Sequence, residues 1–291
     1  MKTQNLLMAA FCILISVSCG PRTDKEYLSD VLQKMNKVES VSYKVVRQAW
    51  LPGEKDPVYT ITSEVYEHIN PQDTAIGSSF VEFQDNAFRG VYDGKVSSYV
   101  YEEEGEKWIR EDDFTTKSPL PFRMVMPEFF YYTQSILKYA ITTQDSIELS
   151  LKDLGDDYLM ELTIHMPVQV EFFGKARYMP QNPYVYDPTS VYKIWISKKD
   201  DMPYRYRREM EGNMNEASCS DFIYNPVDKE CIVATNYYPE GFEIVKKRQR
   251  SSKPTVDMTG KKAPDWTLTD MKGQKVSLSG IKSKVILLQF T

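Results

Sequence analysis

Cysteine offers the widest chemistry of any residue type in this chain, because a thiol can carry a lipid, form a disulfide or act as a nucleophile. The 291 residues include four cysteines, at positions 12, 19, 219 and 231, and two histidines, at positions 68 and 165. The cysteines form no Cys-x-x-Cys pair, and the histidines stand in no His-Glu-x-x-His spacing. A structural zinc site needs about four such ligands close together. We therefore predict no catalytic residue, no metal and no cofactor on this chain.

Cys219 and Cys231 lie near each other in the sequence, on either side of a turn-forming Asn225-Pro226 pair. The segments 218–224 and 231–237 both read as strands, and a hairpin of the two would let the thiols face each other. A disulfide that closes so short a loop would contribute about 3 kcal/mol of stability. We predict a structural disulfide between Cys219 and Cys231; two free buried thiols and a redox-active pair are the alternatives.

Other reaction classes lack their usual patterns. The chain contains no Gly-x-Ser-x-Gly elbow, no phosphate-binding loop and no dinucleotide fingerprint. Its acidic clusters, at 102–104, 112–113, 156–157 and 200–201, fall at expected turns, where we interpret them as solvated surface. A net charge of −5 argues against nucleic acid as a partner.

The N-terminus has the layout of an export signal. A basic residue, Lys2, precedes an apolar run over 6–17, which is too short for a membrane-spanning helix of about 20 residues. The run ends in Ser16-Val17-Ser18-Cys19-Gly20, which resembles a bacterial lipobox. The resemblance implies that a signal peptide of residues 1–18 is removed and that membrane lipid is attached to Cys19. A plain secretory signal is the alternative. The expected location is the cell envelope outside the cytoplasm, with an outer membrane favoured because Gly20 is not Asp.

Residues 20–255 change from helical to strand periodicity. Apolar residues at helical spacing predict helices over 24–37 and over about a dozen residues from Phe129, and 173–189 reads as a long proline-containing loop. Residues 158–166 alternate between apolar and polar, as half-buried strands do. Asp93-Gly94 predicts a hairpin turn. The other expected strands lie at 41–50, 58–67, 78–84, 91–92, 96–101, 107–110, 147–151, 191–197, 203–209, 218–224, 231–237 and 242–248.

This element order predicts an α+β fold, a curved antiparallel sheet with N-terminal and mid-chain helices. The opening helix and strand, Tyr92-Asp93-Gly94-Lys95, and Trp195-Ile196 followed by Met202-Pro203-Tyr204-Arg205 resemble the periplasmic lipoprotein-carrier (LolA-like) fold. The resemblance implies a half-barrel whose apolar concavity holds an acyl ligand. The alternative is that the abundant tyrosine, phenylalanine and methionine side chains simply fill a core.

The C-terminal residues carry a different resemblance. A basic, polar stretch up to Pro254 reads as a linker, and Gly260-Lys261-Lys262-Ala263-Pro264-Asp265-Trp266 follows it. A short hairpin around Gly273 and an apolar run over 285–288 come next. The pattern resembles the opening of a thioredoxin-like domain of the AhpC/TSA and TlpA type. In that family the apolar strand leads into a Cys-x-x-Cys loop, but this sequence ends at Thr291 without one, so we expect a fragment or a truncated gene.

The expected domains are a signal peptide (1–18), a LolA-like β domain (19–250), a linker (251–259) and an incomplete thioredoxin-like domain (260–291). The resemblance in the last domain leads us to predict the N-terminal part of a membrane-anchored, extracytoplasmic thiol–disulfide oxidoreductase with a protein disulfide partner. As given, the chain would be inactive. The alternative is a lipid- or lipoprotein-binding envelope lipoprotein with a vestigial tail, and a third is a structural envelope protein without a small ligand.

Overall fold

The computed structural model describes residues 22–103, 105–115, 122–181, 185–226, 231–246, 260–262, 264–270 and 272–283. The chain divides into two compact units, Met1–Lys247 and Arg248–Thr291. The expected signal peptide, Cys19 and the apolar run 285–288 lie outside the described residues.

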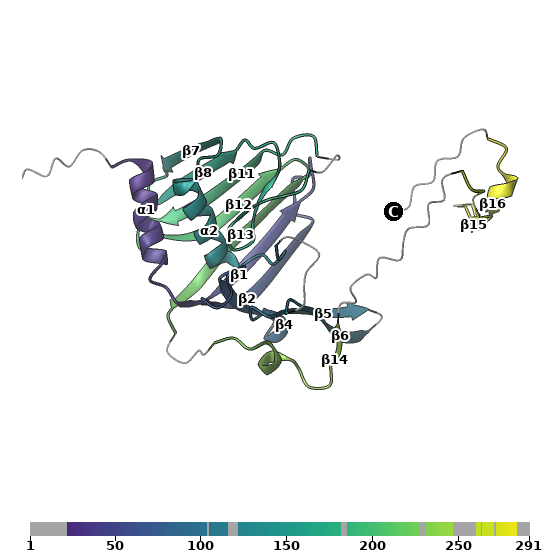
Figure 1. The fold of residues 1–291 in the computed structure, drawn as a ribbon, viewed down its shortest axis with the longest axis horizontal. Helices are drawn as coiled ribbons and strands as arrows, with labels where there is room; N and C mark the ends of the chain where they lie inside the picture. Colours follow the sequence, from purple (N-terminus) through teal and green to yellow (C-terminus); the bar gives the residue numbers. More distant parts are fainter. Residues whose placement is uncertain are drawn as a thin grey trace, which may run out of the picture. The chain divides into compact units, whose positions relative to one another are not determined.

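The first unit is built on one twelve-stranded sheet (Figure 1). Its strand order is β14-β6-β5-β4-β3-β2-β1-β13-β12-β11-β8-β7, and every pairing is antiparallel except that of β14 with β6. Two further short strands, β9 and β10, pair with each other. The strand bounds are β1 Ser40–Trp50, β2 Tyr59–Ile69, β3 Ser78–Gln84, β4 Ala87–Tyr92, β5 Val96–Glu103, β6 Glu106–Asp113, β7 Ile147–Asp153, β8 Asp157–Ile164, β9 Val170–Phe172, β10 Ala176–Tyr178, β11 Ser190–Ser197, β12 Met202–Met210, β13 Asn213–Tyr224 and β14 Glu243–Lys246.

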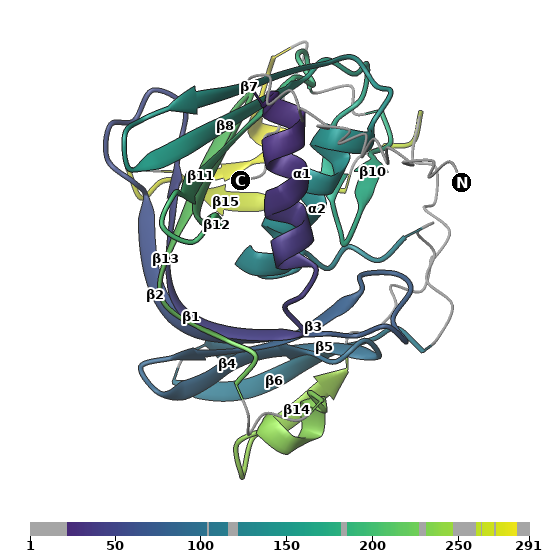
Figure 2. The ribbon, with the colours of Figure 1, turned by 90° about the vertical axis from the view of Figure 1, so that its left-hand side faces the viewer.

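The sheet is open and curved, and its concave face wraps around two helices, α1 (Asp24–Met35) and α2 (Phe129–Thr142) (Figure 2). This arrangement confirms the coarse prediction of a mostly β protein with an N-terminal and a mid-chain helix. Adjacent residues of a strand face opposite sides of a sheet, so Val65 and Tyr66 contribute to different clusters. Val65 joins the main core between the helices and the sheet, whereas Tyr66 joins a second core with Ile232 and Ala234, beside the short 3-10 helix η1 (Ala234–Tyr237).

Helix α1 begins with a capping box. The Thr23 hydroxyl accepts a hydrogen bond from the backbone N–H of Glu26, and the Glu26 carboxylate accepts one from the backbone N–H of Thr23. This reciprocal pair satisfies two amides that the helix cannot pair internally. Leu28, Val31 and Met35, at helical spacing, are fully buried against the sheet.

Helix α2 has no side-chain cap of its own, because Glu128 at its N-cap position makes no capping hydrogen bond. Glu67 on β2 takes that role instead. Its carboxyl accepts hydrogen bonds from the backbone N–H groups of Phe130 (2.8 Å) and Tyr131 (3.2 Å), and one from the Tyr43 hydroxyl. The start of α2 is therefore fixed by the sheet.

Two sequence expectations in this unit are wrong in detail. The segment 231–237 is not a strand, because its second half forms η1. The stretch 173–189 is not loop throughout, because it contains β10, which pairs with β9. Both elements are short and owe their conformation to tertiary contacts rather than to local periodicity, because η1 packs against β4 and β5 whereas β10 pairs with β9 and contacts α2.

The second unit contains an antiparallel pair, β15 (Thr267–Thr269) with β16 (Lys275–Ser277), followed by a 3-10 turn, η2 (Leu278–Gly280). The predicted turn at Gly273 is present, with φ of +79°, a value that glycine adopts without strain. None of the described residues of this unit is buried. The described part of the unit is thus a local hairpin, and a thioredoxin-like domain is not shown.

Candidate functional site

The first unit holds a cavity of about 430 Å³, a size typical of small-ligand sites. Strands β1, β2, β5, β6, β12 and β13 contribute to its wall, together with the segment 122–128 that leads into α2. The described residues that line it are Arg47, Gln48, Tyr59, Ser97, Tyr99, Asp112, Phe114, Met124, Val125, Met126, Pro127, Glu128, Phe129, Tyr206, Asn215, Glu216 and Ala217.

Two of the lining residues, Arg47 and Glu128, form a charged triad with Glu82 on β3. The Arg47 guanidinium donates through Nη1 to Glu82 Oε1, at 2.7 Å, and through Nη2 to Glu128 Oε2. All three side chains are at least three-quarters buried. Burial raises the pKa of the Glu128 carboxyl and Glu82 adds to the rise, while Arg47 opposes it. Burial alone would lower the pKa of Arg47, but the two carboxylates raise it above its usual value.

Apolar and aromatic side chains form the rest of the wall. Val125 and Phe129 are buried, whereas Met124 and Met126 are 54% and 37% exposed, so the methionines lie where the cavity meets solvent. Tyr99 lies across Gly90, and a Cβ at position 90 would come within 2.5 Å of the Tyr99 ring. The position of this aromatic wall residue therefore depends on a glycine on the neighbouring strand.

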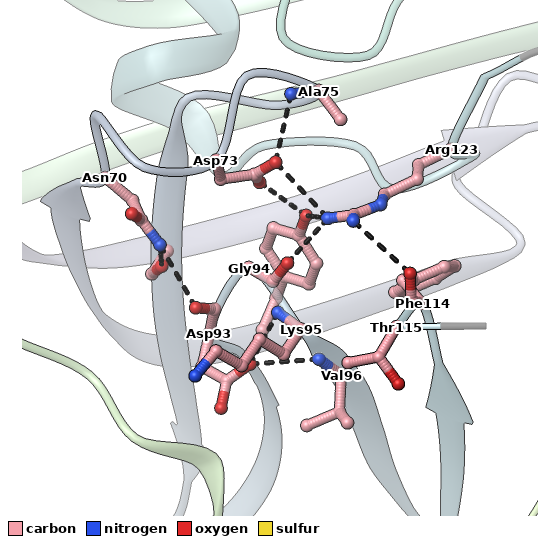
Figure 3. Close-up of polar contacts among 12 residues, drawn as sticks. Asn70, Asp73, Ala75, Asp93, Gly94, Lys95, Val96, Phe114, Thr115 and Arg123 are labelled. Carbon is pink, nitrogen blue, oxygen red and sulfur yellow. Dashed lines mark hydrogen bonds and ion pairs between the residues drawn. The ribbon is translucent and has the colours of Figure 1, made fainter. Parts of the chain in front are cut away.

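The segment 122–128 is attached to the sheet by Arg123 (Figure 3). Its Nη1 donates to Asp73 Oδ1 at 3.2 Å, to the Tyr92 hydroxyl at 2.9 Å and to the backbone carbonyl oxygen of Gly94 at 2.6 Å. The Asp73 carboxylate also accepts from Tyr92. This network joins the cavity wall to the β2–β3 connection and to the β4–β5 turn, the turn predicted from Asp93-Gly94.

The two predicted disulfide partners are not brought together. Cys219 is buried on β13, where burial raises the pKa of its thiol, and Cys231 is exposed; both thiols are free. The physical reason is topological. Cys219 belongs to the main core between the helices and the sheet, whereas Ile232, next to Cys231, belongs to the second core.

The two histidines also lie apart. His165 on the surface approaches Glu148, with 3.2 Å between Nε2 and Oε1, and His68 contacts the neighbouring carbonyl of Ile69. Across the residues that the structure describes, no group of three or more His, Cys, Asp or Glu side chains could hold a metal ion. Within the same residues, no helix is both long and apolar enough to cross a membrane.

The sequence suggested an apolar concavity only through the LolA-like resemblance, and it identified none of the residues that line this cavity. The three residues of the triad come from β1, β3 and the N-cap of α2, and no spacing in the sequence links them. Asp112, interpreted as a solvated turn residue, instead lines the cavity from β6. The sequence contains one weak indication of a polar site. Arg47 occupies an inward position of a strand whose other inward positions, such as Val45, are apolar.

Comparisons with known proteins were made at three levels. No protein-family model and no curated protein sequence matches the chain. Among solved structures, LprF from Mycobacterium bovis is similar, with 8% identity over 72% of this chain and 96% of that chain, and a TM-score of 0.35. A DUF1329 family protein from Desulfovibrio piger is 12% identical over 71% and 93%, with a TM-score of 0.34. A LolA superfamily protein from Nitrosomonas europaea is 8% identical over 73% and 97%, with a TM-score of 0.23.

The predicted function as part of a thioredoxin-like oxidoreductase is wrong. No family model matches the chain, and none of these three neighbours is described as a thioredoxin-like protein. The resemblance that suggested a redox function rests on the short second unit, where the structure describes a hairpin without a core.

Proposed function

We propose that this chain is an envelope protein that binds a lipid or the lipid part of a lipoprotein in the concavity of its curved sheet. The observation that carries the proposal is the cavity of about 430 Å³, whose wall divides into an apolar part and a polar part. Apolar area removed from water favours binding by roughly 25 cal/mol per Å². An amphiphile satisfies both parts at once, with its chain against Met126 and Phe129 and its polar end near Arg47.

The position of the methionines supports the same ligand class. Methionine is flexible and adapts to apolar partners of irregular shape. Met124 and Met126 stand at the mouth of the cavity, where an acyl chain would enter. The lipobox-like sequence before Cys19 would hold this mouth close to a supply of lipid, with the chain anchored through a lipidated Cys19 in the cell envelope.

Binding is tested with the purified chain and phenylnaphthylamine, an uncharged probe whose fluorescence rises in apolar sites. We expect saturable binding, and an amphiphile recovered by mass spectrometry from protein purified without detergent. In Met126→Trp the larger ring fills the mouth, and we expect about a tenfold loss of probe affinity, equivalent to about 1.4 kcal/mol. Leu51→Trp is the matched control, because Leu51 is exposed and does not line the cavity.

The proposal would be overturned by folded protein that neither carries an amphiphile nor binds the probe, or by Met126→Trp binding as well as Leu51→Trp. That first outcome would favour a structural envelope protein. The anchor is tested separately: Cys19→Ser should move the protein from the membrane fraction to the soluble fraction, and retention in the membrane fraction would contradict lipidation at Cys19.

A further inference from the structure

The positive charge in the cavity wall is already balanced by carboxylates. Arg47 is the only basic residue among the described residues that line the cavity. Its two terminal nitrogens each donate to a carboxylate, Nη1 to Glu82 and Nη2 to Glu128. A carboxylate or phosphate on a ligand would have to share this one cation with two buried acids, which would repel it.

The charge balance at this point is unfavourable for an anion. One guanidinium stands between two carboxyls, so the triad carries a net negative charge when both are ionised. A proton on Glu128, whose pKa burial raises, would make the triad neutral, and the triad would still offer no net positive charge to a ligand.

The remaining polar lining is uncharged or already paired. Gln48, Ser97 and Asn215 present amide and hydroxyl groups, which bond to ligand hydroxyls, esters and amides. Glu216 accepts from Arg205 Nη2 at 2.9 Å and from Arg207 Nε at 2.8 Å. Neither arginine is among the residues that line the cavity.

We infer that the cavity selects amphiphiles with an uncharged polar end, such as acylglycerols and acyl amides, against fatty acids and other lipids that carry a carboxylate or phosphate. The inference rests on the proposed function, since it names the ligand class of the same site. Selectivity of this kind arises from the repulsive element, here the two acids that hold Arg47, as much as from attractive contacts.

The test compares two ligands with the same chain, dodecanoate and the glycerol ester of dodecanoic acid, as competitors for phenylnaphthylamine near neutral pH. We expect the ester to bind about thirtyfold more tightly, the effect of one uncompensated charge roughly 8 Å away at an effective dielectric constant near 20. Equal affinities, or tighter binding of dodecanoate, would overturn the inference while leaving the proposed function intact. Failure of both ligands to bind would instead count against the proposed function itself.

A charge variant gives a directional check. Glu128→Gln removes one negative charge from beside Arg47, so dodecanoate should gain at least about tenfold in affinity while the ester changes little. Glu82→Gln removes the other negative charge and serves if the first variant does not fold. The control is Glu148→Gln, which removes an equal charge from an exposed site on β7. An unchanged dodecanoate affinity in a folded Glu128→Gln or Glu82→Gln protein would refute the role of the triad.

Discussion

Glu67 provides the most quantitative prediction, because it is a fully buried acid with a defined structural task. Its carboxyl caps α2 from β2 and is inaccessible to solvent. Burial raises its pKa from an ordinary 4.5 to about 8, although the hydrogen bond from Tyr43 and those from the helix amides act in the opposite direction and Glu128 adds to the rise.

The sign of the pH dependence follows from this shift. An acid whose pKa is higher in the folded protein holds its proton more tightly there, so its contribution to stability is full below about pH 4.5 and is lost as the pH rises towards 8. A pKa shift of this size changes the contribution of Glu67 to the free energy of unfolding by about 5 kcal/mol in total. About 4 kcal/mol of that contribution is lost between about pH 5 and about pH 8.

The perturbation is Glu67→Gln, which keeps the side-chain volume and cannot ionise. The amide NH2 group takes the place of the carboxyl oxygen that accepts from the backbone N–H of Tyr131. At about pH 5 we therefore expect the free energy of unfolding of the variant to be about 1 kcal/mol lower than that of the wild type. At about pH 8 the variant should be the more stable protein, because the wild type must then bury a charge. The two curves of unfolding free energy against pH therefore cross.

Urea unfolding followed by tryptophan fluorescence at several pH values measures both curves, and Glu64→Gln, exposed on the same strand, controls for the loss of a surface charge. The difference between wild type and variant cancels the titration of other groups. Parallel curves for wild type and Glu67→Gln would refute the reasoning, as would a wild type whose stability rises over this pH range.

Three further predictions concern other contacts. Arg123→Ala should lower the unfolding free energy by about 3 kcal/mol in urea titrations, because it leaves Asp73 buried without its cation; a loss under about 1 kcal/mol would contradict the network. Thr23→Ala removes the capping box and should lower the free energy of unfolding by about 1 kcal/mol, which a thermal melt would show as a lower Tm. An unchanged Tm would argue against the cap. In non-reducing buffer, a thiol reagent should modify exposed Cys231 in the native protein and Cys219 only on unfolding; a protein that stays unmodified in denaturant would instead establish the disulfide.

Local patterns predicted the elements of this fold well. The spacing of Leu28, Val31 and Met35 identified α1, and all three are buried. The alternation that predicted a strand at 158–166 is observed in β8, where Met160, Leu162 and Ile164 face the core. Each of these signals arises from residues within a few positions of one another, so the sequence carries it directly.

The site was not predictable in the same way. The triad depends on three segments that meet only after the sheet has curved, and a single arginine in a strand does not reveal its partners. Glu67 shows the same limit, because a buried acid that caps a distant helix reads, in a sequence, like any polar residue of a strand. The motif at the C-terminus misled for the opposite reason: the hairpin around Gly273 is specified locally and formed as expected, but a local match did not determine the function of the protein.

The central position of β1 also has a consequence for the order in which the chain folds. β1 pairs with β2, which follows it closely, but its other neighbour is β13, with Val41 opposite Tyr224. The pairing that completes the middle of the sheet must therefore wait until nearly the whole first unit has been synthesised, and loop-closure entropy opposes it until then. We expect slow folding, with one side of β1 unpaired during and after synthesis. If the N-terminal segment directs export, as we propose, that delay would help keep the chain in the unfolded form that a translocation channel accepts.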